Sequence, residues 1–158
     1  MLARLMFAIV DYKARKGLVD TDAVESEETS VKDRARQTGV RGETYAYWYL
    51  RRHGYMLVAR NYTSPDMKGE IDMVGYDGQV LAFVEVKTRS SADPNQPKPE
   101  EAVNLDKRYH LRRMAQQFLR VRRLESAPHR FDVLAIEARA GARPVVRLHK
   151  GAFAPHSN

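Results

Sequence analysis

Three charged side chains interrupt segments that otherwise have the apolar character of buried strands. Asp72 lies within the apolar segment 71–74, and Glu85 and Lys87 lie within the segment 81–87. Burying a charge in a protein core is unfavourable unless the charge is paired or bound to a metal ion. We therefore expect these three side chains to form a functional cluster.

The spacing of these residues allows them to meet. Side chains two apart on a strand share a face, so Glu85 and Lys87 point the same way. Asp77-Gly78, between the two apolar segments, is a typical hairpin turn and places Asp72 on the neighbouring strand. The three side chains are expected to converge at one end of this hairpin.

Two carboxylates on rigid strands are the ligands that a hard cation such as Mg²⁺ prefers. A bound cation polarises a phosphodiester, and a lysine beside it orients the attacking water or stabilises charge that develops on the phosphate. Glu43, on the core-facing stripe of a preceding helix, is expected to complete the shell of the metal. The predicted catalytic residues are thus Glu43, Asp72, Glu85 and Lys87. The three carboxylates are the predicted metal ligands, and the predicted cofactor is Mg²⁺ or Mn²⁺.

Patterns of apolar residues predict the elements that hold these side chains. Helices are expected at residues 42–53 and 105–125, because apolar residues recur there at three- and four-residue spacing. Strands are expected at 55–62, 71–76, 80–88, 131–136 and 145–149, with loops at 63–68 and 90–100. The order α-β-β-β-α-β-β is typical of an α/β domain with two or three layers.

Charge divides the chain near residue 38. Residues 1–38 carry seven basic and seven acidic residues, and their middle is acidic and poor in apolar residues. This composition predicts a partly disordered N-terminal extension that is dispensable for folding. Residues 39–150 are expected to form the folded domain, and residues 151–158 a C-terminal tail. The formal net charge of +7 falls entirely in 39–158, which favours nucleic acid as a partner, with DNA expected.

The exposed face of the predicted 105–125 helix is the candidate for nucleic-acid contact. Arg112, Arg113, Arg120 and Arg123 are predicted to bind the phosphate backbone. A basic face that is only solvated is the alternative. Asp132 is interpreted as a structural partner of Arg130.

The composition excludes several classes of site. The chain has no cysteine, so it has no disulfide, no zinc–thiolate site and no cysteine nucleophile. The longest apolar run, residues 5–10, is far shorter than the roughly 20 residues of a membrane span. No membrane partner is therefore expected. The expected location is the cytoplasm.

Short motifs around the cluster resemble the YraN-like family of predicted bacterial endonucleases. These motifs are Arg41-Gly42-Glu43, Gly54-Tyr55, Arg60-Asn61-Tyr62, Gly69-Glu70-Ile71-Asp72, Phe83-Val84-Glu85-Val86-Lys87-Thr88-Arg89, Ala102-Val103 and Arg130-Phe131-Asp132-Val133. Asp72 followed by Glu85-Val86-Lys87 is also similar to the catalytic pattern of the restriction-endonuclease-like superfamily, an acid followed by (Asp/Glu)-x-Lys. The resemblance covers about residues 39–150.

The resemblance implies a restriction-endonuclease-like core, with a central mixed sheet flanked by helices, similar to archaeal Holliday-junction resolvases. It implies that Glu43, Asp72 and Glu85 surround Mg²⁺ and that Lys87 is the lysine of the pattern. The proline that commonly precedes the aspartate is absent, because Ile71 stands there. The predicted function is metal-dependent hydrolysis of phosphodiester bonds in branched or structured DNA. A non-catalytic nucleic-acid-binding module on the same fold is the alternative, and a homodimer is expected by analogy with the resolvases.

Overall fold

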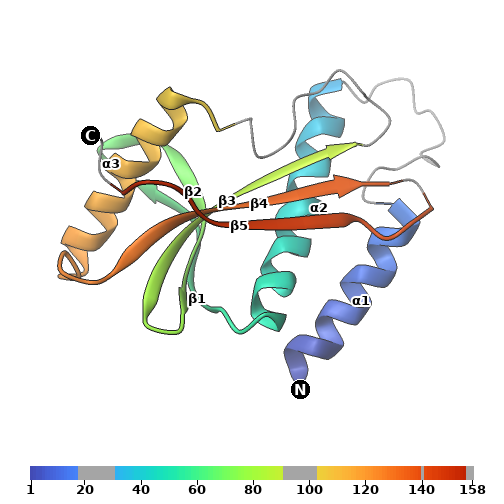
Figure 1. Cartoon of the computed structure of the whole chain (residues 1–158). Helices are drawn as coiled ribbons and strands as arrows, with labels where there is room; N and C mark the ends of the chain where they lie inside the picture. The colour runs from blue at the N-terminus through green and yellow to red at the C-terminus, as the bar shows by residue number, and fades with distance from the viewer. Residues whose placement is uncertain (18–30, 91–102, 140, 156–158) are drawn as a thin grey trace.

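A five-stranded mixed sheet forms the centre of the computed structural model, which describes residues 1–17, 31–90, 103–139 and 141–155. The strand order is β1-β2-β3-β4-β5, with β3 and β4 parallel and the other neighbours antiparallel (Figure 1). The elements are α1 (Leu2–Gly17), α2 (Val31–Arg52), β1 (Met56–Ser64), β2 (Met67–Asp77), β3 (Val80–Ser90), α3 (Leu105–Val121), β4 (His129–Ala138) and β5 (Val145–Phe153). The predicted α/β class with a central mixed sheet and flanking helices is confirmed.

The helices cover opposite faces of the sheet. Parallel neighbours need a crossover connection, and α3 lies in the connection between β3 and β4. Ala82 and Val84 of β3 pack in one core cluster with residues of α1 and α2, whereas Leu81 and Phe83 pack in a second cluster with α3. Because successive strand residues point to opposite faces, α1 and α2 lie on one face and α3 on the other.

The N-terminal helix is packed onto the domain. Phe7 and Ala14 of α1 are buried in the same cluster as Tyr45 and Leu50 of α2. The rings of Phe7 and Tyr45 meet edge to face, with centroids 5.4 Å apart. The acidic stretch that suggested disorder lies at residues 20–30, outside the described residues, and its composition says nothing about the apolar helix before it.

Several predicted boundaries are wrong. α2 begins at Val31 rather than near residue 42, so this helix runs through the division expected at residue 38. α3 ends at Val121, and Arg123 follows it with a positive φ of 55°. β5 continues to Phe153, into the expected C-terminal tail, because Phe153 stacks on Phe131 with centroids 4.7 Å apart. Most of the loop expected at 90–100 lies outside the described residues.

The buried ion pair expected at Asp132 is confirmed. Its side chain is fully buried and accepts hydrogen bonds from the Arg130 guanidinium, the Tyr55 hydroxyl and the Gly151 amide. These bonds tie β4 to β5 and to Tyr55, which lies between α2 and β1. None of the described helices has an apolar stretch long enough to cross a membrane.

Candidate metal centre

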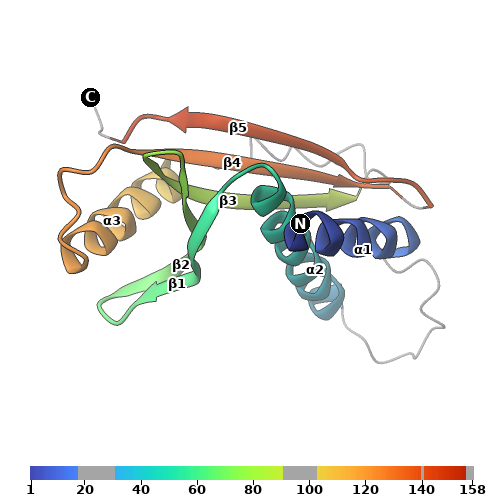
Figure 2. The same ribbon diagram turned by 90° about the horizontal axis from the view of Figure 1, so that it is seen from below.

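The candidate site lies where β2 parts from β3. The two strands pair from Asp77–Val80 to Met73–Val84. One step further, the Val86 amide donates a hydrogen bond to Oδ2 of Asp72, at 2.7 Å. The carboxylate of Asp72 thus takes the place of a backbone acceptor, and the far end of β2 turns away with β1 from the rest of the sheet (Figure 2).

Asp72 and Glu85 lie close enough for the charge of Glu85 to raise the pKa of Asp72. The two residues stand next to Met73 and Val84, the last register partners of β2 and β3. Both are buried, at 8% and 3% exposure.

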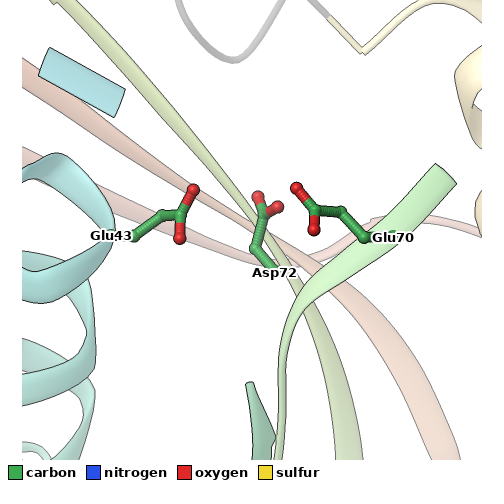
Figure 3. A group of neighbouring side chains, drawn as sticks. All are labelled: Glu43, Glu70 and Asp72. Carbon is green, nitrogen blue, oxygen red and sulfur yellow. The ribbon is translucent and has the colours of Figure 1, made fainter. Parts of the chain in front are cut away.

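Three carboxylates gather in the gap between the strands. Glu43, Glu70 and Asp72 each offer an oxygen, and these oxygens all lie within 4.8 Å of one another. Figure 3 shows the three carboxylates turned toward one another, Glu43 from α2 and the other two from β2. Glu43 is also held by Asn61, whose Nδ2 donates to its Oε2 at 2.9 Å. Such a set of oxygen donors suits a hard divalent cation.

Gly42 brings α2 close enough for Glu43 to reach this group. A Cβ built on Gly42 would overlap the hydroxyl of Thr88 on β3. Any larger residue at position 42 would push the helix away from the strand. The glycine therefore sets the distance between Glu43 and the carboxylates on β2.

Glu85 lies beside this group and is paired with two lysines. Its Oε1 is 2.8 Å from the Lys87 ammonium and 3.2 Å from the Lys107 ammonium. Its Oε2 is buried and has no hydrogen-bond partner among the described residues. A buried polar atom without a partner is unfavourable, so this oxygen is available to a ligand.

Burial and neighbouring negative charges both raise the pKa of Asp72. Burial raises this pKa to about 7, with further increases from the charges of Glu85 and Glu43. The hydrogen bond from Val86 and the charge of Lys107 act in the opposite direction. A cation bound between the carboxylates would favour the ionised form of Asp72.

The structure therefore brings the four predicted residues into one region, with Glu43 and Asp72 in the carboxylate group and Glu85 and Lys87 at its side. Sequence reasoning did not include Glu70 or Lys107. Glu70 carried a usable signal, because it lies two residues before Asp72 on the same strand. Lys107 carried none, because its contact depends on how α3 docks.

The N-terminus of α3 is positioned by two hydrogen bonds. Asn104 caps the helix by accepting a bond from the Lys107 amide at 2.9 Å. The His110 ring is hydrogen-bonded to the carbonyl of Lys68 on β2. Together they hold Lys107 over Glu85.

The arginines predicted on α3 lie apart from the carboxylates. Arg112 donates to the carbonyl of Ala154 at 2.9 Å, and Arg120 donates to Gln117 at 2.7 Å. Arg112, Arg113 and Arg120 line a cavity of about 510 Å³ that includes none of the metal-centre residues. Their role in nucleic-acid binding stays a prediction.

Comparison with known proteins extends over most of the folded region. The profile of "Uncharacterised protein family UPF0102" matches residues 42–136. The chain is 43% identical over 117 residues to a UPF0102 protein of Koribacter versatilis, covering 74% of this chain and 79% of the relative. It is 44% identical over 112 residues to one of Solibacter usitatus, covering 71% and 82%. It is 40% identical over 119 residues to one of Symbiobacterium thermophilum, covering 75% and 98%. The profile match contains the four carboxylates and both lysines, and α1 lies outside it.

Proposed function

This chain belongs to the uncharacterised protein family UPF0102, and from its own residues we propose that it is a metal-dependent nuclease. The proposed reaction is hydrolysis of phosphodiester bonds in branched or structured DNA, with Mg²⁺ or Mn²⁺ as cofactor. The observation that carries the proposal is the gathering of four carboxylates and two lysines where β2 parts from β3.

The residues present fit a divalent cation. Glu43, Glu70 and Asp72 supply converging oxygen donors, which are the donors that Mg²⁺ takes. Burial, and then the charges of Glu85 and Glu43, raise the pKa of Asp72, and a bound cation would favour its ionised form. The unpartnered Oε2 of Glu85 offers one more buried oxygen.

Each residue has a chemical task in this proposal. When bound, the cation would polarise the phosphodiester and lower the pKa of the attacking water. The carboxylates of Glu43, Glu70 and Asp72 hold the cation. Lys87 is 29% exposed at the side-chain level, so its ammonium faces both Glu85 and solvent, where it can orient a water or stabilise charge on the phosphate. Lys107 helps to balance the charge of Glu85.

A cleavage panel tests the proposal. Purified protein is incubated with junction, flap, single-stranded and linear duplex DNA, in Mg²⁺, in Mn²⁺ and in EDTA. We expect metal-dependent cleavage with a preference for the branched substrates, and no cleavage by an Asp72→Asn variant. If folded protein that binds Mg²⁺ cleaves none of the substrates, the nuclease assignment fails. Binding of DNA without cleavage would then support a non-catalytic module.

A further inference from the structure

A basic surface runs around α2 from the metal centre to α1. Helix residues are separated by roughly 100°, so Tyr47, Arg51, Trp48 and Arg52 follow one another around the helix, starting from Glu43. The opposite side of α2 is buried against the sheet and α1. Glu43 is the one acidic residue between positions 38 and 52, and it belongs to the carboxylate group.

Two arginines on this surface are held in place by aromatic rings. The guanidinium carbon of Arg51 lies 5.7 Å from the ring centre of Tyr47 and 5.8 Å from that of Trp48. Arg51 also donates to the Tyr47 hydroxyl at 3.0 Å. Arg60, from β1, lies 5.8 Å from the Tyr47 ring centre and donates to Thr44 at 3.1 Å. Both guanidinium groups are thus oriented before any ligand arrives.

The surface ends in a pocket that is lined by four arginines. The pocket has a volume of about 590 Å³ and lies between α1, α2 and the connection from β4 to β5; its lining residues are Arg4, Phe7, Ala8, Asp11, Tyr12, Arg15, Arg52 and Arg143. Figure 1 shows α1 beside α2, with the β4–β5 connection reaching the upper end of α1. Four arginines and one aspartate leave a formal excess of three positive charges.

Asp11, the one aspartate that lines the pocket, holds two of its arginines in place. Asp11 is 3% exposed and accepts hydrogen bonds from Arg143 at 2.6 and 3.0 Å and from Arg15 at 3.3 Å. The Tyr45 hydroxyl donates to it at 3.0 Å. The two arginine side chains nevertheless remain 59% and 50% exposed. Arg52 lies over the Phe7 ring, 4.8 Å from its centre.

Fixed guanidinium groups of this kind match phosphate, which they bind through paired N–H donors. Water and salt weaken the binding of one small anion to exposed arginines. A polyanion that touches several of them at once releases counterions and binds more tightly. Arginines spread over a long surface therefore favour a polymer over a free phosphate.

We propose that this α2 surface and the arginine pocket bind the phosphate backbone of the nucleic acid as it leaves the metal centre. The position of the reacting phosphate rests on the function proposed above. The nine helical steps from Glu43 to Arg52 span about 14 Å along the helix, which equals the rise of about four nucleotides in one strand. Three of the pocket's four arginines, Arg4, Arg15 and Arg143, lie outside the residues that the family profile matches, and the pocket gives α1 a role in binding.

The test removes two pocket charges that do not hold Asp11. Arg4→Gln/Arg52→Gln is compared with wild type and with Lys13→Gln/Arg139→Gln, which removes two exposed charges that do not line the pocket. Fluorescence anisotropy measures binding of labelled duplex and four-way-junction DNA in EDTA, over about 50 to 200 mM salt. Thermal unfolding checks each variant, and Arg4→Gln alone is used if the double variant is destabilised.

We expect the slope of log affinity against log salt concentration to become less negative by about two in the pocket variant, because each lost phosphate contact contributes about 0.9. Its affinity near 150 mM salt should fall on the order of tenfold or more, and the control should change little. An unchanged slope, or an equal loss in the control, overturns the proposal. Binding to phosphatidylglycerol vesicles is measured in parallel. The proposal is also overturned if the pocket variant loses binding to these vesicles while its affinity for DNA is intact. A wild-type protein that never cleaves contradicts the nuclease function instead, because the binding comparison uses no cleavage.

Discussion

Replacing Asp72 by asparagine tests whether the carboxylate group needs a cation. Asparagine has nearly the same shape and keeps an oxygen to accept the Val86 amide. The pKa of Asp72 is about 7 in the folded protein, first because of burial and then because of the charge of Glu85. Its ordinary value is about 3.9.

The sign of the pH effect follows from this difference. The folded protein binds the proton on Asp72 more tightly than the unfolded chain does, so this contribution to stability is fully present below about pH 4 and is lost as the pH rises through about 7. A pKa difference of about 3 corresponds to an upper limit of about 4 kcal/mol, at 1.36 kcal/mol per unit. The variant has no ionisable group at position 72 and therefore lacks this loss.

Urea unfolding at pH 5 and pH 8 in EDTA measures the effect. We expect the free energy of unfolding of wild type, relative to Asp72→Asn, to fall by a few kcal/mol between the two pH values. Adding Mg²⁺ at pH 8 should raise the free energy of unfolding of wild type in proportion to ln(1 + [Mg²⁺]/Kd). The free energy of unfolding of the variant should stay nearly unchanged. Parallel pH profiles in EDTA, or cleavage by the variant at close to the wild-type rate, would refute this account of the site.

Four further substitutions examine single parts of the structure. Lys87→Ala should keep Mg²⁺ binding but lower the single-turnover cleavage rate by a factor on the order of a hundred or more; an unchanged rate would remove the lysine from the reaction. Glu70→Gln should weaken Mg²⁺ binding, measured by calorimetry, by about tenfold or more, whereas a bystander would leave it intact. Gly42→Ala should destabilise the protein by about 1–3 kcal/mol in urea, because the added methyl group overlaps β3; equal stability would mean that the helix approaches less closely. Phe7→Ala should lower the free energy of unfolding by about 3–5 kcal/mol, while Leu5→Ala, at a 60% exposed position, should change it little. A small effect at both positions would support the view that the first 38 residues are dispensable.

Local patterns were sufficient to predict the central part of the fold. The alternation in β2 and β3 and the turn at Asp77-Gly78 depend only on neighbouring residues, and the structure contains that hairpin. The docking of α1 depends on a contact between Phe7 and Tyr45, which are 38 positions apart. No local pattern reports such a contact. The apolar spacing that predicts this helix begins near residue 42, whereas α2 begins at Val31 and contains both Gly39 and Gly42.

The same distinction applies to the site. Asp72, Glu85 and Lys87 could be identified because a charge within an apolar strand conflicts with its surroundings, and this conflict is visible in the sequence. Glu70 precedes the apolar segment and is exposed, so its charge causes no such conflict, and only its two-residue spacing from Asp72 points to the site. Lys107 reaches Glu85 only after α3 has docked on β2. Residues recruited by tertiary packing escape a reading of strands and helices taken one at a time.

The balance of formal charge links the metal centre to the basic surface on α2. Four carboxylates and two lysines leave the centre at −2 when all are ionised, which one divalent cation neutralises. A phosphodiester that arrives there brings a further negative charge and meets no net positive charge in return. Attraction for the substrate must then come from nearby groups, because screening limits the reach of exposed charges to about 10 Å. Arg60 donates a hydrogen bond to Thr44, the neighbour of Glu43. The guanidinium groups of Arg51 and Arg60 both lie over the ring of Tyr47. In the proposed mode of binding, the arginines beside the centre hold the backbone while the carboxylates bind the cation.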